Sequence, residues 1–311
     1  MITLLVIIAA VAPAIGLLYF VYTKDKLQQE PVPELLKAFG YGVGSAFLAM
    51  LVALPLSGFG LVPSAPVTAW DHFRVAVFGA GIPEELCKFL MLMQFLRRCK
   101  FFDEYMDGIV YTACIGLGFA ALENILYLFQ NFAAWPAVGA MRALVSVPGH
   151  FFFAVVMGYY VSKAFFDHPS GRVRNLVLSV VVPMLLHSLF DALLMISTVS
   201  AAAAGLIALF AGLYFFMLKT SRKLFNKHLA KDEAIQKEAE EAAIAAYYES
   251  FSEGGADAQE PLEGYRPMEL SADAQEPLEG YRPIELSVDA QESSEGYRPM
   301  ELSEEDTVKD S

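Results

Sequence analysis

The feature that most constrains this chain is a series of long apolar runs that recur through its first 220 residues. Each run is close to the ~20 residues that a helix needs to cross the ~30 Å hydrocarbon core of a bilayer. The runs are predicted at roughly 1–22, 34–57, 70–96, 106–131, 137–166, 174–197 and 199–218. A hydrophobic content of 56 % is also too high for an ordinary soluble domain. We therefore predict an all-α fold, a polytopic transmembrane helix bundle of about seven spans.

The basic residues predict how this bundle is oriented, because Lys and Arg near span ends are retained on the cytoplasmic side. They fall in every second loop, around residues 24–26, 97–100, 163–174 and 219–227. This alternation predicts an N-out, C-in, multi-pass protein of a cell membrane. Only Arg74 and Arg142 fit the alternation poorly, since they stand near the outer ends of their runs. The first run has no basic segment before it, so we expect an uncleaved anchor.

The composition changes beyond the last apolar run. Residues 221–250 are rich in Lys, Glu and Ala, which predicts a charged cytoplasmic helix. Within residues 251–311, a unit of about sixteen residues returns at Asp257, Asp273 and Asp289. Its acids and prolines leave few apolar side chains to stack, so a disordered acidic repeat tail is expected. The predicted regions are thus a membrane domain (1–220), a charged helix (221–250) and the tail (251–311).

The tail carries nearly all of the net charge. Residues 249–311 hold 18 acids and 4 bases, a balance of −14, against a formal charge of −13 for the whole chain. An acidic balance excludes a nucleic-acid partner for this region. Two interpretations stay open, a docking array for a cytoplasmic partner and an expanded repeat with no binding role.

Several ionisable residues interrupt the predicted spans. A charge inside a bilayer costs at least a few kcal/mol, so such residues are candidates for function. They are Glu84, Glu85 and Lys88 in the third run, Glu123 with Asn124 and Tyr127 in the fourth, His150 in the fifth, and His187 with Asp191 in the sixth. Each of these residues alone would also suit a structural contact between helices.

Depth connects these residues. Counted from the nearest cytoplasmic charges, Glu85, Glu123, His150 and His187 lie 12 to 16 residues into their helices. At 1.5 Å per residue this is roughly 18–24 Å. Four helices would therefore present ionisable groups in one layer, which favours a shared site over independent packing contacts.

Spacing within the helices predicts partners. Glu84 and Lys88 stand at i and i+4, so we expect them to pair, while Glu85 points elsewhere and meets water or substrate. His187 and Asp191 have the same spacing, and the carboxylate would fix the tautomer of the imidazole.

This set of side chains suits the activation of water. A Glu accepts the proton, a His or a bound metal polarises the carbonyl, and a Lys or Tyr stabilises the developing negative charge. No Gly-x-Ser-x-Gly or His-Glu-x-x-His motif supports a serine hydrolase or a thermolysin-like enzyme. We predict a peptidase; the alternatives are a proton-coupled transporter and a non-catalytic, immunity-type membrane partner.

Four motifs in this sequence resemble those of the PrsW family of intramembrane proteases, which is related to the CAAX prenyl endopeptidases and bacteriocin-processing peptidases. They are Pro-Glu-Glu-x-x-Lys at 83–88, Phe-x-x-x-Glu-Asn-x-x-Tyr at 119–127, Pro-Gly-His at 148–150 and His-x-x-x-Asp at 187–191. The resemblance implies a bacterial enzyme of the cytoplasmic (inner) membrane. Its expected activity is regulated proteolysis of a membrane-anchored protein substrate, such as an anti-sigma factor.

The residues that we expect to be catalytic are Glu84, Glu85, Lys88, His150 and His187. The residues that we expect to support them are Glu123, Asn124, Tyr127 and Asp191. Zinc bound by His150, His187 and Glu123 is compatible with the ligand chemistry but is not required by it, and a metal-free glutamic mechanism stays open. The CAAX enzymes typically carry Glu-Glu-x-x-x-Arg, whereas Lys88 stands one position earlier, which argues against prenylated substrates.

Overall fold

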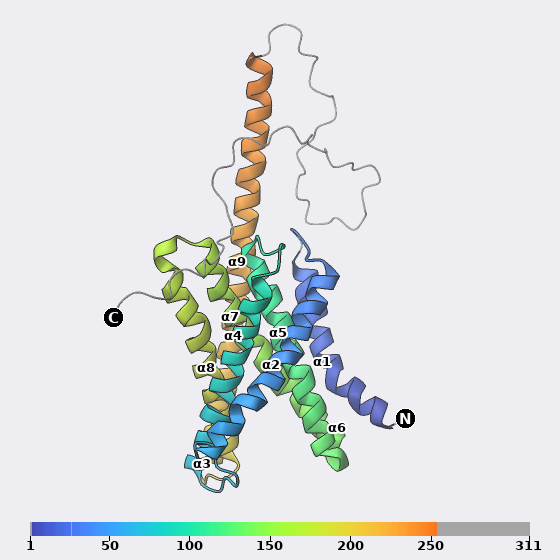
Figure 1. Cartoon of the computed structure of the whole chain (residues 1–311), viewed down its shortest axis with the longest axis vertical. Coiled ribbons are helices and arrows are strands. Elements are labelled where there is room, and N and C mark those ends of the chain that lie inside the picture. The colour runs from blue at the N-terminus through green and yellow to red at the C-terminus, as the bar shows by residue number, and fades with distance from the viewer. Residues whose placement is uncertain (1, 26, 254–311) are drawn as a thin grey trace, which may run out of the picture. The chain divides into compact units, whose positions relative to one another are not determined.

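The structure, a computed structural model, describes residues 2–25 and 27–253 as one all-helical unit (Figure 1). Its long helices are α1 (Ile2–Lys24), α2 (Val32–Gly58), α4 (Ile82–Leu96), α5 (Tyr105–Gln130), α7 (Val147–Phe166), α8 (Arg172–Ser197) and α9 (Ala203–Glu253). The short elements are α3 (Ala69–Arg74), η1 (Val75–Gly81), η2 (Phe132–Ala134), α6 (Trp135–Met141), η3 (Arg142–Ser146) and η4 (Pro169–Gly171). The predicted all-α class is confirmed. The predicted repeats lie outside the described residues.

Among the described residues, six helical stretches are long and apolar enough to cross a membrane. The predicted run 70–96 is not one of them. It is helical from Ala69 to Leu96, but it is divided into α3, η1 and α4, and it carries charged residues of the candidate site. This segment packs along α2 and α8 inside the bundle, so we keep the prediction that it is a membrane span in addition to these six.

Helix α5 lies at the centre of the bundle, against α1, α2 and α7. Of its most apolar stretch, 78 % is buried, compared with 11 % for α9, which lies at the periphery. Its crossing with α7 is close because Gly158 meets Gly108 there. A Cβ at Gly158 would collide with the Gly108 backbone. This contact fixes the distance between two helices that carry site residues.

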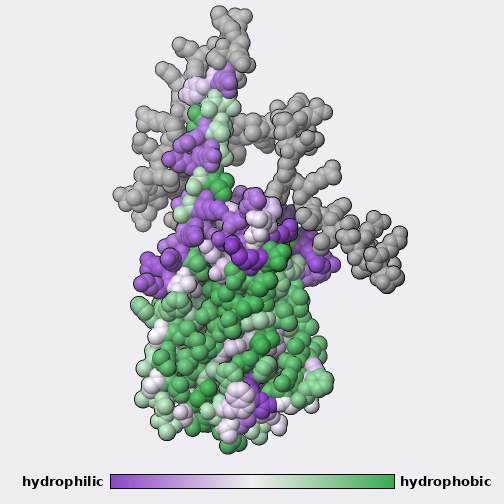
Figure 2. All heavy atoms as spheres, turned by 90° about the vertical axis from the view of Figure 1, so that its left-hand side faces the viewer, coloured by the Kyte–Doolittle hydropathy of each residue, from purple (hydrophilic) through white to green (hydrophobic). Residues whose placement is uncertain are grey.

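The outer surface is suited to lipid. Figure 2 shows a broad apolar band and hydrophilic residues gathered at the end from which α9 projects. Large apolar side chains on peripheral helices, such as Leu4, Leu185 and Phe215, are more than 60 % exposed. An exposed apolar surface of this extent marks a membrane-facing protein. The side of the membrane on which the hydrophilic end lies stays a prediction.

Helix α9 is continuous over 51 residues and includes both the predicted last span and the predicted charged helix. Its charged part is anchored to the bundle through Asp232. The Asp232 carboxylate accepts hydrogen bonds from the backbone amides of Tyr105 at 2.9 Å and Met106 at 2.8 Å. It therefore satisfies free donors at the start of α5, where negative charge is favoured. The predicted boundary at residue 220 falls within this helix.

Candidate active site

Two of the helices that carry site residues begin in the same unusual way. Pro83 and Pro148 stand at the second position of α4 and α7, directly after the π-helical segments η1 and η3. Proline has no amide hydrogen, so it cannot make the usual helical bond to the residue four positions back. Just before each proline, the amide of Ile82 donates to Val77 and that of Val147 donates to Arg142, five residues back. Such wide turns are frequent at functional sites.

Glu85 is the central residue of the cluster. Its side chain is fully buried between α4 and α8. Its Oε1 atom accepts a hydrogen bond from Lys88 Nζ at 2.7 Å and lies 2.8 Å from His187 Nδ1. Its Oε2 atom has no hydrogen-bond partner within the described part of the chain. A buried oxygen without a partner is costly, so Glu85 has unused capacity to bind a proton or a cation.

His150 connects this pair to α5. Its Nδ1 lies 3.0 Å from Lys88 Nζ, and its Nε2 lies 2.8 Å from Glu123 Oε2. Because an ammonium group only donates, Nδ1 must accept, and the ring proton is then on Nε2 and is donated to Glu123. The partners thus assign the tautomer of His150.

Arg142 is a site residue that sequence reasoning missed. Its Nη2 lies 2.6 Å from Glu123 Oε2, and its Nε donates to Asn124 Oδ1 at 2.6 Å. Its guanidinium also lies over the Tyr127 ring, 4.1 Å from the centroid. Asn124 in turn donates to the Ala10 carbonyl at 3.0 Å, which connects the cluster to α1. The available signal was that Arg142 breaks the charge alternation of the loops.

The predicted pairing of Lys88 with Glu84 is present, but Lys88 makes a closer contact with Glu85. Lys88 Nζ is 2.7 Å from Glu85 and 3.5 Å from Glu84, so it contacts both carboxylates, and Glu85 does not face water as expected. Glu85 is covered by α8 and is the more desolvated of the two, so the ammonium compensates it more closely. Glu84 keeps a side chain that is 13 % exposed. Asp191 lies 3.4 Å from His187 Nε2, the position that the sequence spacing predicted.

A cavity of about 550 Å³ leads to this cluster. Its polar lining comes from Ser57, Glu84, Glu123, Tyr127 and Asp191, and apolar residues, mainly of α2 and η1, form most of the rest. Glu84 is therefore the member of the Pro-Glu-Glu motif that borders open space. An apolar passage with convergent carboxylates is typical of a site that receives an apolar ligand.

Four side chains are close enough to hold one metal ion. A ligand atom from each lies within 4.8 Å of the others, and they are Glu84, Glu85, His150 and His187. Two of the three predicted ligands, His150 and His187, belong to this group. Glu123 does not belong to it among the described residues and instead contacts Arg142 and His150.

The charges of the cluster favour an additional cation. The carboxylates are those of Glu84, Glu85, Glu123 and Asp191, and the cationic side chains are Lys88, Arg142 and His187, both ring nitrogens of which face carboxylates. The net charge is then −1, and it becomes −2 when an ion takes the place of the His187 proton. A divalent ion would neutralise this excess and would also give Glu85 Oε2 a partner. The nitrogen and oxygen donors suit zinc.

Comparison with known proteins gives a consistent result. The family described as "PrsW family intramembrane metalloprotease" matches residues 30–220. The chain is 36 % identical over 218 residues to "Protease PrsW" of Bacillus subtilis (strain 168), covering 70 % of this chain and 94 % of that protein. It is 36 % identical over 191 residues to "Protease PrsW" of Clostridioides difficile (strain 630), covering 60 % and 78 %. It is 37 % identical over 187 residues to "Protease PrsW" of Geobacillus kaustophilus (strain HTA426), again covering 60 % and 78 %. No solved structure matches the chain.

Proposed function

The chain belongs to the PrsW family of intramembrane proteases, and from this premise we propose that its buried Glu-Lys-His cluster is the catalytic centre. The peptidase prediction is confirmed at the level of the family, ahead of the transporter and immunity-type alternatives. The observation that carries the assignment of the site is the contact between Glu84, at the cavity, and the Lys88 and His187 side chains behind it.

In the proposed mechanism Glu84 is the general base. A water molecule in the cavity gives its proton to Glu84 as its oxygen bonds to the carbonyl carbon of the scissile peptide. Lys88 donates to the oxyanion that forms on the carbonyl oxygen. Glu84 then returns the proton to the leaving nitrogen as the carbon–nitrogen bond breaks. Glu85 positions this machinery by holding Lys88 at 2.7 Å and His187 at 2.8 Å.

We also propose that the cluster is a metal site, with zinc as the ion. Glu85, His150 and His187 would hold it, which leaves Glu84, the fourth side chain within reach, free to act as the base. When bound, a divalent ion would lower the pKa of a water ligand and polarise the carbonyl. His150 keeps its orientation through Glu123 at 2.8 Å, and Arg142 neutralises that carboxylate. The support for this proposal is the ligand geometry, the net negative charge and the unpartnered Glu85 oxygen.

The proposed substrate is a membrane-anchored protein that enters the cavity in an extended form. Apolar walls from α2 and η1 would accept apolar side chains, while the carboxylates meet the peptide backbone. An anti-sigma factor, as the family resemblance implies, is the substrate class that we propose to examine first. The proposed location is the cytoplasmic membrane of a bacterium.

The test uses Glu84→Gln and Glu85→Gln, with Glu233→Gln on the exposed face of α9 as the matched control. Purified variants are incubated with a panel of single-span substrates, and the products are identified by mass spectrometry. We expect both site variants to lose at least about 100-fold in rate. In Glu84→Gln the amide accepts no proton at neutral pH, and in Glu85→Gln the charge that holds Lys88 and His187 is lost. Glu85→Gln should also lower thermal stability, since it leaves the buried Lys88 without its charge partner.

The same preparation tests the metal. We expect elemental analysis to find one zinc per chain, and His187→Ala to lose bound zinc and activity together. Full cleavage by Glu84→Gln would contradict the base assignment. Active protein without a transition metal would contradict the metal proposal and leave the glutamate mechanism in place.

A further inference from the structure

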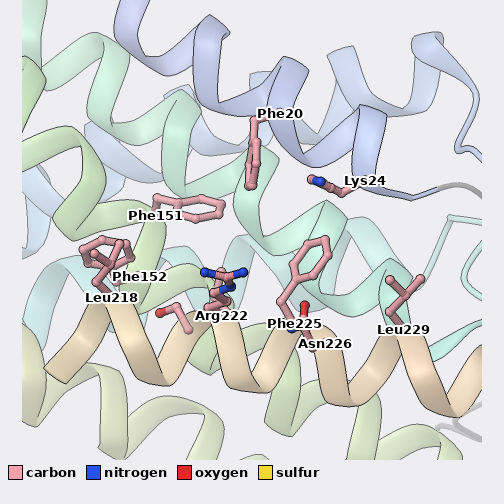
Figure 3. Close-up of a pocket in the computed structure, with 11 residues that line it drawn as sticks. Phe20, Lys24, Phe151, Phe152, Leu218, Arg222, Phe225, Asn226 and Leu229 are labelled. Carbon is pink, nitrogen blue, oxygen red and sulfur yellow. The ribbon is translucent and has the colours of Figure 1, made fainter. Parts of the chain in front are cut away.

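A second cavity, of about 510 Å³, lies between α1, α7 and α9. Figure 3 shows its labelled side chains pointing into the space between α1 and α9. It has no lining residue in common with the cavity at the catalytic cluster, within the described chain. Phe151 and Phe152 of α7 and Leu218 of α9 give it an apolar wall. The first of these residues directly follows His150 of the candidate active site.

Two cationic side chains reach this apolar groove from separate helices. Lys24 ends α1 and Arg222 stands on α9, and both extend into the groove in Figure 3. In the range 2–25 and 27–253, neither forms an ion pair with an acidic side chain. Two unpaired positive charges beside aromatic walls indicate a ligand that is anionic at one end and apolar at the other.

A third observation is independent of charge. Ser221 lines the same groove, is only 4 % exposed, and has an Oγ atom without a hydrogen-bond partner in the described part of the chain. Most buried hydroxyl groups in proteins are satisfied, because leaving one unpaired costs about 1–3 kcal/mol. An acceptor oxygen supplied by a ligand between Lys24 and Arg222 would satisfy it.

We propose that this groove binds an anionic phospholipid, with the phosphate headgroup between Lys24 and Arg222 and an acyl chain along Phe151, Phe152 and Leu218. The location fits, because Lys24 ends the apolar helix α1 and Arg222 follows the predicted apolar run 199–218, and basic residues at the ends of apolar runs are near lipid headgroups. Basic pockets between membrane helices on the cytoplasmic side are suited to such headgroups. A free phosphate would leave the apolar wall uncovered, and a neutral lipid would leave both charges unpaired.

A bound lipid would connect α1 to α9 across α7. It would therefore stabilise the helix that carries His150 without touching the catalytic cluster. Mass action then predicts a thermal stability that rises with the concentration of the anionic lipid.

The experiment uses the full chain in nanodiscs of phosphatidylcholine, with and without phosphatidylglycerol. The readouts are the phosphatidylglycerol that is retained by the protein in native mass spectrometry and the thermal unfolding temperature. The variants are Lys24→Gln, Arg222→Gln and the double variant. Lys223→Gln is the matched control, because it removes the same charge from an exposed neighbour that does not line the groove.

We expect the wild type to retain phosphatidylglycerol over phosphatidylcholine, and the double variant to bind it about 30-fold more weakly, from about 1 kcal/mol for each basic residue. Lys223→Gln should change this affinity by less than about twofold. Circular dichroism confirms that each variant is folded, and the single variants report separately if the double variant is not.

Three outcomes would overturn the proposal. The first is equal retention of phosphatidylcholine, and the second is an equal loss in Lys223→Gln, which would indicate general surface charge. The third is full competition by inorganic phosphate at the same concentration, which would show that the ion alone is the ligand.

Discussion

Glu123 illustrates how single contacts position the catalytic cluster. Its carboxylate meets the His150 imidazole at 2.8 Å and the Arg142 guanidinium at 2.6 Å. The contact with Glu123 orients His150, a proposed metal ligand, and Arg142 neutralises the negative charge of Glu123. Arg142 also contacts Asn124, so it joins α5 to η3. We therefore regard Arg142 as a positioning residue.

Replacing Arg142 with Gln should lower kcat about 10- to 100-fold and leave KM nearly unchanged, as is usual when the partner of a ligand residue is lost. Arg142→Lys should recover part of the loss, because it restores the charge but not the contact with Asn124. Arg74→Gln is the matched control, since Arg74 donates to the Leu61 carbonyl away from the cluster. Steady-state cleavage kinetics provide the measurement. A loss confined to KM would mean that Arg142 binds substrate instead.

Asp25, at the hydrophilic end of the bundle, should make the folding stability of the protein depend on pH. Burial, together with the smaller effects of the nearby Glu30 and Asp232 carboxylates, raises its pKa from 3.8 to about 7. The folded chain therefore holds a proton that the unfolded chain releases. The resulting stability is complete below about pH 4 and is lost as the pH rises to about 7.

Asp25→Asn should consequently stabilise the protein at pH 8, by about 1–3 kcal/mol, and have little effect at pH 4. Thermal unfolding in detergent at the two pH values measures this, with the exposed Glu233→Gln as control. Lower stability of Asp25→Asn at pH 8 would show that the carboxylate has a favourable partner there.

At the scale of elements, the crossing of α5 and α7 holds the two halves of the site at a fixed distance. Helix α5 contributes Glu123 and α7 contributes His150, and the two side chains meet at 2.8 Å. The backbones approach at Gly108 and Gly158, where a side chain would not fit. Close approach of this kind is how small residues allow membrane helices to pack.

Gly158→Leu should therefore destabilise the bundle by about 1–3 kcal/mol and lower activity, because overpacking separates α5 from α7. Gly212→Leu on α9 is the control, since a Cβ added there meets no described atom within 4 Å. Thermal unfolding and cleavage rate are measured on the same samples. Equal behaviour of the two variants would show that the crossing tolerates a wider spacing.

At the scale of the whole molecule, the bundle and the convergence of its polar residues could be predicted from the sequence. Apolar length identifies spans, and the constant rise of a helix fixes depth, so Glu85, Glu123, His150 and His187 could be placed in one layer. The closer contact of Lys88 with Glu85 than with Glu84 could not be predicted, because it depends on which face of α4 is covered by α8. The role of Arg142 depends equally on a tertiary contact.

Because every proposed site residue lies within residues 1–253, removal of residues 254–311 should leave cleavage by the purified enzyme within about twofold of wild type. If the repeats capture a cytoplasmic partner, the same deletion should slow cleavage in cells through lost avidity. Parallel assays on purified protein and in cells separate the two effects. Loss of activity in the purified deletion would place the tail in the catalytic unit.

Because η1 and η3 are π-helical, the number of residues within these two segments determines the geometry of the site. A wide turn accommodates one residue more than a regular helix, and one residue corresponds to about 100° of helical rotation. One residue fewer within η1 would convert it to a regular helix while α3 and α4 keep their present faces. One residue more would turn Glu84 and Glu85 away from His187. The arrangement of charges that cuts a peptide thus depends on counting residues, as well as on which residues they are.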